Sequence, residues 1–83
     1  MTKDQARLKP VLLQVNTRGS WANLTAFDAA NDLAYAHIVD ATETLGKLHQ
    51  GVISFRIVSD EQPPIPLMRW TQKDGWKKVT HAD

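Results

Sequence analysis

The stretch Val11-Leu-Leu-Gln-Val-Asn-Thr-Arg-Gly-Ser-Trp-Ala-Asn-Leu-Thr-Ala-Phe27 is typical of a β-hairpin. Two runs rich in apolar residues flank Thr17-Arg-Gly-Ser20, and Gly19 can supply the positive φ that a tight turn needs. A loop of two or four residues centred there gives the facing pairs Val15 with Ala22, Leu13 with Leu24, and Val11 with Ala26. All six residues are apolar and lie on one face, as strand alternation requires of a core side.

The pattern that follows the hairpin predicts an amphipathic helix over residues 29–49. Apolar residues recur there at spacings of three and four, namely Ala34, Ile38, Ala41, Leu45 and Leu48. Asp28 or Asn31 can cap the N-terminus of this helix. Gly46 weakens its last turn, because glycine is a poor helix former. We expect the apolar stripe to pack on a sheet.

Three further strands are predicted after the helix. In residues 52–58 the core side is formed by Ile53, Phe55 and Ile57, while Ser54 and Arg56 face away. Three prolines exclude regular pairing in the segment 59–66, which is therefore expected to be a surface loop. Residues 67–71 and 76–80 then form a second hairpin around Asp74-Gly75, a dipeptide that favours hairpin turns.

The register of the second hairpin depends on the length of its loop. A loop of two or four residues places Met68, Trp70 and Val79 on one side of the strands. It places on the other side Arg69, Thr71, Trp76 and Lys78. A loop of three residues would reverse the second strand, because the side-chain period of a strand is two.

The order of elements is therefore β-β-α-β-β-β. It predicts an α+β fold in which an antiparallel sheet carries one helix on one face, in two layers around a single core. The chain of 83 residues fits one domain. We expect this domain to occupy residues 11–80, with a flexible N-terminal tail at 1–10 and a C-terminal tail at 81–83.

Composition narrows the class of protein. The chain has no cysteine, which excludes thiolate catalysis and thiolate metal sites, and it contains no apolar run near the roughly 20 residues of a membrane span. The first ten residues lack the apolar centre of a signal peptide. We therefore expect a cytoplasmic protein without a membrane partner.

The charged residues are distributed unevenly over the predicted layers. The segment 28–51 contains four acidic residues and one lysine, a formal charge of −3, so the rest of the chain carries +4 of the total of +1. One helix covers one face of the sheet, and the other face meets water or a partner. The alternation of side chains along the strands places Gln14 on this open face. It also places there the residues of a predicted interaction surface, which are Trp21, Asn23, Arg56, Arg69, Trp76 and Lys78.

Catalytic and metal-binding patterns are absent from the sequence. His37 and His49 are twelve residues apart along one helix, too far to share a metal ion. Ser20 lies in Arg-Gly-Ser-Trp, which lacks the pattern of a nucleophile elbow, and the four glycines form no phosphate-binding loop. We expect a protein that is not an enzyme and needs no cofactor or metal.

The sequence allows two functional interpretations of the open face. It also allows a purely structural one, in which the tryptophans only cover the ends of the hairpins. Tryptophan and arginine are preferred anchors of protein interfaces, which favours a protein-interaction or accessory domain, including a homodimer. The alternative is weak binding of single-stranded nucleic acid, in which the tryptophans stack on bases and the cations neutralise phosphates.

Overall fold

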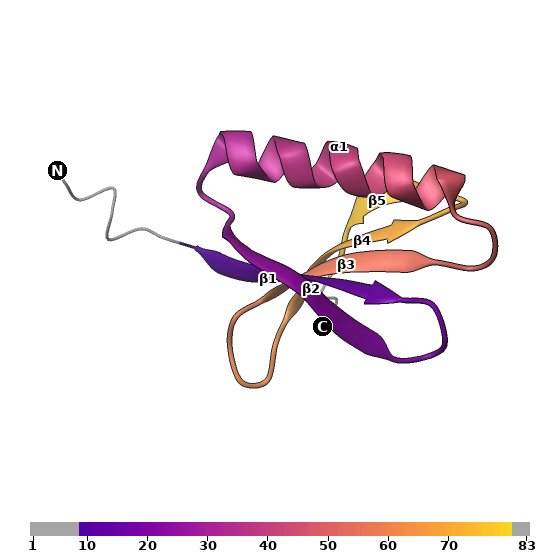
Figure 1. The fold of residues 1–83 in the computed structure, drawn as a ribbon. Coiled ribbons are helices and arrows are strands. Elements are labelled where there is room, and N and C mark those ends of the chain that lie inside the picture. The colour runs from indigo at the N-terminus through magenta and orange to yellow at the C-terminus, as the bar shows by residue number, and fades with distance from the viewer. Residues whose placement is uncertain (1–8, 81–83) are drawn as a thin grey trace, which may run out of the picture.

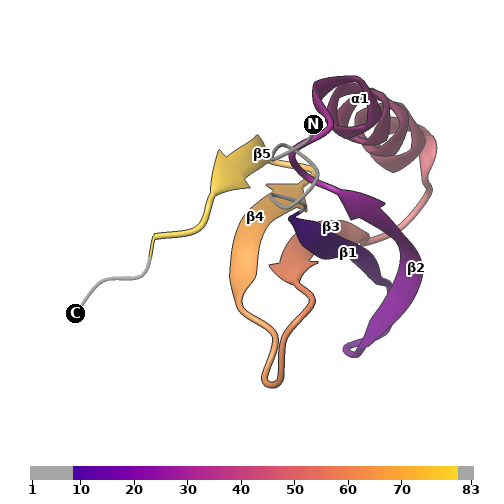
Figure 2. The ribbon, with the colours of Figure 1, turned by 90° about the vertical axis from the view of Figure 1, so that its left-hand side faces the viewer.

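The protein folds as an open antiparallel sheet with one helix across one face (Figures 1 and 2). The computed structural model describes residues 9–80, so most of the predicted N-terminal tail and all of the predicted C-terminal tail lie outside the described residues. The elements are β1 (Pro10–Asn16), β2 (Trp21–Asp28), α1 (Asp32–Leu48), β3 (Ser54–Ser59), β4 (Pro66–Thr71) and β5 (Gly75–Lys78). The five strands lie in the order β2-β1-β3-β4-β5. The predicted α+β class and element order are confirmed.

The core lies between the helix and the central strands. Its buried residues come from all three central strands and from the loop before β3: Val11, Leu13, Ile53, Phe55, Ile57 and Trp70. The rings of Phe55 and Trp70 meet edge to face, with centroids 5.7 Å apart. The predicted core side of β3 is therefore confirmed. Val58 is also fully buried, although it lies on the side of β3 that faces away from the helix.

A β-bulge changes the register of the first hairpin. Val15 pairs with Ala22 as predicted, but the register shifts between Leu13 and Gln14. Leu24 is the additional residue of β2, and its exposed fraction is 51%. The other two predicted pairs are wrong, and the structure has Leu13 opposite Thr25 and Val11 opposite Phe27. One extra residue moves every following side chain to the other face of the strand.

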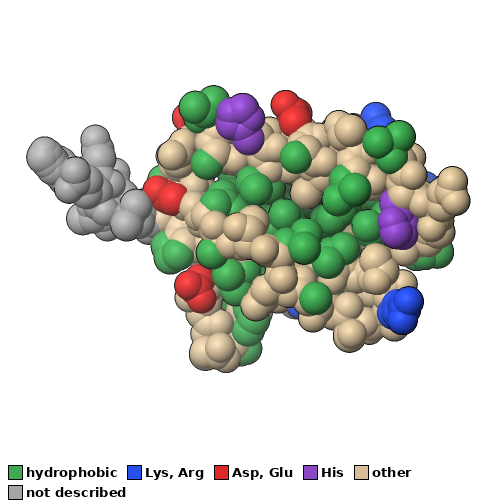
Figure 3. All heavy atoms as spheres, viewed as in Figure 1, with side chains coloured by type: hydrophobic (Ala, Val, Ile, Leu, Met, Phe, Trp, Pro, Cys, Tyr) green, Lys and Arg blue, Asp and Glu red, His purple; other side chains and the backbone are tan. Residues whose placement is uncertain are grey.

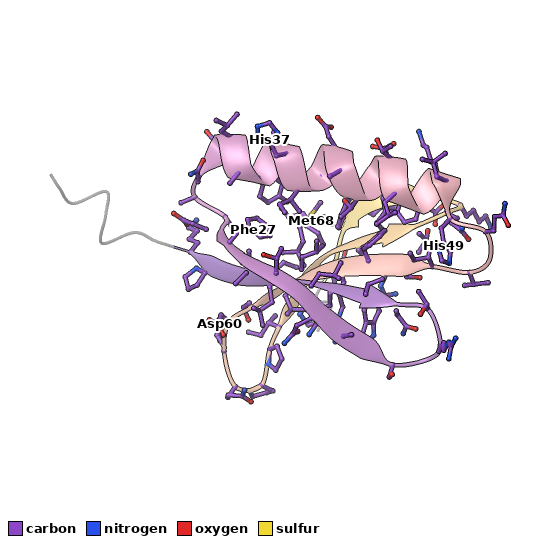
Figure 4. All side chains as sticks on the ribbon, viewed as in Figure 1. Phe27, His37, His49, Asp60 and Met68 are labelled. Carbon is purple, nitrogen blue, oxygen red and sulfur yellow. The ribbon has the colours of Figure 1, made fainter. Side chains whose placement is uncertain are left out.

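The bulge brings an aromatic residue to the core. Phe27 replaces Ala26 on the side that faces the helix, and its ring meets Tyr35 of α1 edge to face at 6.1 Å. Figure 4 shows Phe27 in the space between α1 and the sheet. A large ring at the end of β2 therefore replaces the small side chain that a regular hairpin would place there.

The buried face of α1 also differs from the prediction. The helix begins after Asn31, whose side chain accepts a hydrogen bond from the backbone N–H of Ala34. Leu45 and Leu48 of the predicted stripe are exposed, and the buried residues of the helix are Thr42 and Gly46. The reason is the indole of Trp70, which occupies the space directly beneath Gly46.

The loop of the second hairpin has three residues, so the side chains of its second strand lie on the faces opposite to those predicted for a loop of two or four residues. Thr71 pairs with Gly75, so three residues, 72–74, separate the paired ends, and Gly75 has a φ of +73°. Trp76 consequently pairs with Trp70 on the helix side, where its indole N–H donates to the backbone carbonyl of Val39. The predicted placement of Trp76 on the open face is wrong.

A carboxylate joins the start of β1 to the end of β2. The Oδ1 of Asp28 accepts the backbone N–H groups of Lys9 and Ala30, each at 2.9 Å. The N–H of Ala29 donates to the carbonyl of Lys9, and β1 begins at Pro10, one residue before the predicted start of the first strand. The two backbone donors hold the pKa of Asp28 below its ordinary value of 3.8.

The lowered pKa of Asp28 makes part of the stability dependent on acid. The ionised carboxylate stabilises the fold above pH 3.8, and this contribution is lost as pH falls through the lower pKa of the folded state. We expect Asp28→Ala to be less stable than wild type at neutral pH and to lose less stability on acidification. Urea unfolding over a range of pH measures this difference, and parallel curves for the two proteins would refute it.

Candidate binding surface on the open sheet face

Three cations lie side by side on the sheet face that points away from α1. Arg56 of β3 is directly opposite Arg69 of β4, and Arg69 is directly opposite Lys77 of β5. We call these three residues the basic row. Adjacent strands are about 4.7–4.9 Å apart, so the row places like charges on neighbouring positions. Such cross-strand pairs destabilise a sheet, which makes the row costly without an anionic partner.

Polar side chains on β1 and β2 hold Arg56 in position. The Nε–H of Arg56 donates to the Oε1 of Gln14 at 2.6 Å, and the Nε2 of Gln14 donates to the Oδ1 of Asn23 at 2.7 Å. Gln14 is largely buried, with an exposed fraction of 9%. The chain of hydrogen bonds crosses three strands and uses one of the five N–H donors of the guanidinium.

Trp21 covers the guanidinium of Arg56. The Cζ of Arg56 lies 4.3 Å from the centroid of the indole ring, a cation–π distance. Trp21 is the first residue of β2 and pairs with Asn16. The indole therefore restricts the rotamers of Arg56 from one side, while Gln14 fixes its Nε. These two contacts hold the guanidinium in one orientation on the open face.

The basic row has no acidic partner within residues 9–80. The one ion pair of that range joins Lys47 to Glu43 on the helix, and no carboxylate there lies within 4.0 Å of the cationic nitrogens of the row. Partial burial lowers the pKa of Arg56, and the positive charge of Arg69 lowers it further. Asp74 lines a small hollow beside Arg69 and Lys77 at the end of the β4–β5 hairpin.

The structure brings together four of the six residues of the predicted interaction surface. Trp21, Asn23, Arg56 and Arg69 lie on the open face. The predicted placement on the open face is wrong for Trp76 and Lys78, which pair with Trp70 and Met68 on the helix side.

Lys77 is the residue of the basic row that the sequence prediction missed. It faces the open side because the loop of the second hairpin has three residues, 72–74. A glycine placed to take the left-handed conformation after a type I turn is the signal that could have indicated this loop. Gly75 has that conformation in the structure.

The histidines form no site in the described part of the chain. His37 lies in the first half of α1 and His49 caps its C-terminal end, as Figure 4 shows, and both are exposed. Across residues 9–80, no three His, Asp or Glu side chains come close enough to hold a metal ion. The same residues contain no helix of the length and apolarity that crossing a membrane requires.

Comparison with protein-family models, with curated proteins and with solved structures finds no match for this chain.

Proposed function

We propose that the protein is a non-enzymatic interaction domain whose open sheet face binds an acidic segment of a partner protein. The observation that supports this function is the basic row, in which three neighbouring cations have no carboxylate partner in residues 9–80. An acidic segment would neutralise the repulsion within the row, and complementary charge would steer its approach. Arg56, already ordered by Gln14 and Trp21, would lose little side-chain entropy on binding.

The aromatic residues favour a protein partner over single-stranded nucleic acid. Proteins that bind single strands stack successive bases on several aromatic side chains. Trp21 lies on the open face, but Arg56 already covers part of its ring, and Trp70 and Trp76 lie on the helix side. Three cations would also give only a shallow salt dependence, a log–log slope of about −2 at roughly 0.7 per neutralised phosphate.

Self-association through the open face is disfavoured by charge. A two-fold interface places the same patch of both copies together. Two basic rows would then face each other, which adds like-charge repulsion to that already present between Arg56 and Arg69. The partner of this face is therefore proposed to be an acidic protein other than a second copy of this chain.

The absence of cysteine supports the expected cytoplasmic location.

The variant Arg69→Gln separates a binding role from a structural one. It removes the central charge of the row, so we expect the free energy of unfolding to rise by about 0.2–1 kcal/mol at low salt, as cross-strand repulsion is relieved. Salt should reduce this gain, because the charges are partly exposed. The same variant should lose most of its affinity for an acidic peptide. Urea unfolding and fluorescence anisotropy measure the two effects.

A matched control and two probes make the outcome decisive. Lys47→Gln removes the same charge from the helix and should leave binding unchanged. The probes are a labelled glutamate-rich peptide and a labelled single-stranded oligothymidylate. Binding of the peptide that is lost in Arg69→Gln and kept in Lys47→Gln supports the proposal. Binding of the oligonucleotide alone would replace it with the nucleic-acid function, and equal binding by both variants would refute it.

A further inference from the structure

The two edges of the sheet are protected very differently. β5 forms one edge and has four residues, of which Lys77 and Lys78 are charged. Short length and lysines are the usual protection against pairing with another strand. β2 forms the other edge, has eight residues, and contains no proline and no charge before its last residue, Asp28. Residues 22–26 are all exposed, and the bulge at Leu24 is the one protective feature of this strand, so β2 is the less protected edge.

The backbone of β2 has hydrogen-bonding groups directed outward. The N–H of Ala29 donates to Lys9, and in the same register Val11 lies opposite Phe27. Hydrogen-bonding directions alternate along an antiparallel strand, so Ala26 directs its backbone N–H and C=O groups away from β1. The C=O of Ala26 accepts a long hydrogen bond from the hydroxyl of Thr25 at 3.4 Å, and the outward C=O of Asp28 accepts the N–H of Asn31. β2 is the first strand in the order of the sheet, and its neighbour in the sheet is β1.

An apolar band runs beside this edge. Figure 3 shows hydrophobic side chains gathered between α1 and β2, in the face that Figure 1 presents to the viewer. Leu24 of β2 and Leu45 of α1, one on each of these two elements, have exposed fractions of 51% and 52%. A contiguous exposed apolar patch is typical of an interaction surface.

We propose that two copies of the chain pair through β2, antiparallel and edge to edge. An antiparallel pair of identical strands is self-complementary, as a two-fold interface requires. Because residues 21–27 are uncharged, the contact brings no like charges together, in contrast to the basic open face. A two-fold axis perpendicular to the sheet also places both apolar bands on one side, where they extend a common surface.

The pairing has a consequence for the open face. The two sheets become one continuous sheet, and both basic rows lie on its same face. An acidic partner with two acidic stretches could then engage both rows, and the second contact would be intramolecular. The dimer does not depend on the proposed function of the basic row, because the pairing uses the backbone of β2, whereas the row lies on β3, β4 and β5.

Sedimentation equilibrium of the full chain tests the dimer. The wild-type protein should sediment with twice the mass of the chain at micromolar to millimolar concentration. Leu24→Lys should raise the dissociation constant by on the order of tenfold or more, since it places two like charges at the interface. Ala26→Pro should have the same effect by removing an outward N–H, a change that edge strands tolerate.

The control is Val52→Lys, which introduces the same charge at an apolar residue with an exposed fraction of 78%, in the loop before β3. It should leave the dimer intact. Far-ultraviolet circular dichroism must show that each variant is folded, and if Ala26→Pro is unfolded, Leu24→Lys carries the test. A monomeric wild type, or a dimer that is equally weakened by Val52→Lys and Leu24→Lys, would overturn the proposal.

Discussion

Trp70→Ala is expected to remove about 3–5 kcal/mol from the free energy of unfolding, the usual cost of truncating a buried large aromatic residue. The whole stability of a chain of 83 residues is only about 4–12 kcal/mol at 0.05–0.15 kcal/mol per residue. The indole is 1% exposed, meets Phe55 edge to face and lies beneath Gly46 of the helix. Its loss would open a cavity between β4 and α1, so the variant should unfold at a much lower urea concentration than the wild type.

Urea unfolding followed by circular dichroism measures this loss. The matched control is Trp21→Ala, which truncates the same residue type on the open face. It removes the cation–π contact with Arg56 and a side chain that is only partly buried. The free energy of unfolding is therefore expected to fall by about 0.5–2 kcal/mol. Equal losses for the two variants would contradict the assignment of Trp70 to the core and of Trp21 to the surface.

Gly46→Ala is expected to destabilise the protein although alanine is the better helix former. Propensity alone would favour alanine by about 1 kcal/mol. A Cβ at this position would overlap the ring carbons of Trp70, which is fully enclosed and cannot swing away. Overpacking of a tight core typically costs about 1–3 kcal/mol, so we expect a net loss of up to about 2 kcal/mol.

A double-mutant cycle isolates this contact. In a Trp70→Leu background the space beneath the helix is larger, so Gly46→Ala should become neutral or stabilising. Thermal or urea unfolding of the four proteins gives the coupling between the two positions. If Gly46→Ala has the same effect with and without the indole, the close approach of α1 to β4 is not what determines its cost.

The sequence predicted the class of fold because periodicity and turn residues report on it directly. It did not predict the bulge in β2, since the residues around Leu24 alternate as well in a regular hairpin. The buried face of α1 was misassigned for a different reason. The position of a helix on a sheet depends on which bulky side chains lie beneath it, and the place of Trp70 opposite Gly46 is a tertiary property.

The candidate site was predicted where strand parity was reliable. Arg56 and Trp21 lie on strands whose parity near the turn is as predicted, so they reach the open face. Trp76 does not, because one residue more or less in the loop 72–74 reverses its strand. Parity also placed Gln14 on this face, but not its hydrogen bonds to Asn23 and Arg56, which depend on the lateral order of three strands.

The indole N–H signals of the three tryptophans test the central claim, that the open face is the binding surface. In a nuclear magnetic resonance titration with the glutamate-rich peptide, Trp21 reports on the open face, while Trp70 and Trp76 report on the helix side. We predict that the Trp21 signal shifts progressively and that the signals of Trp70 and Trp76 stay in place. Shifts of Trp70 or Trp76 with an unmoved Trp21 would contradict the account.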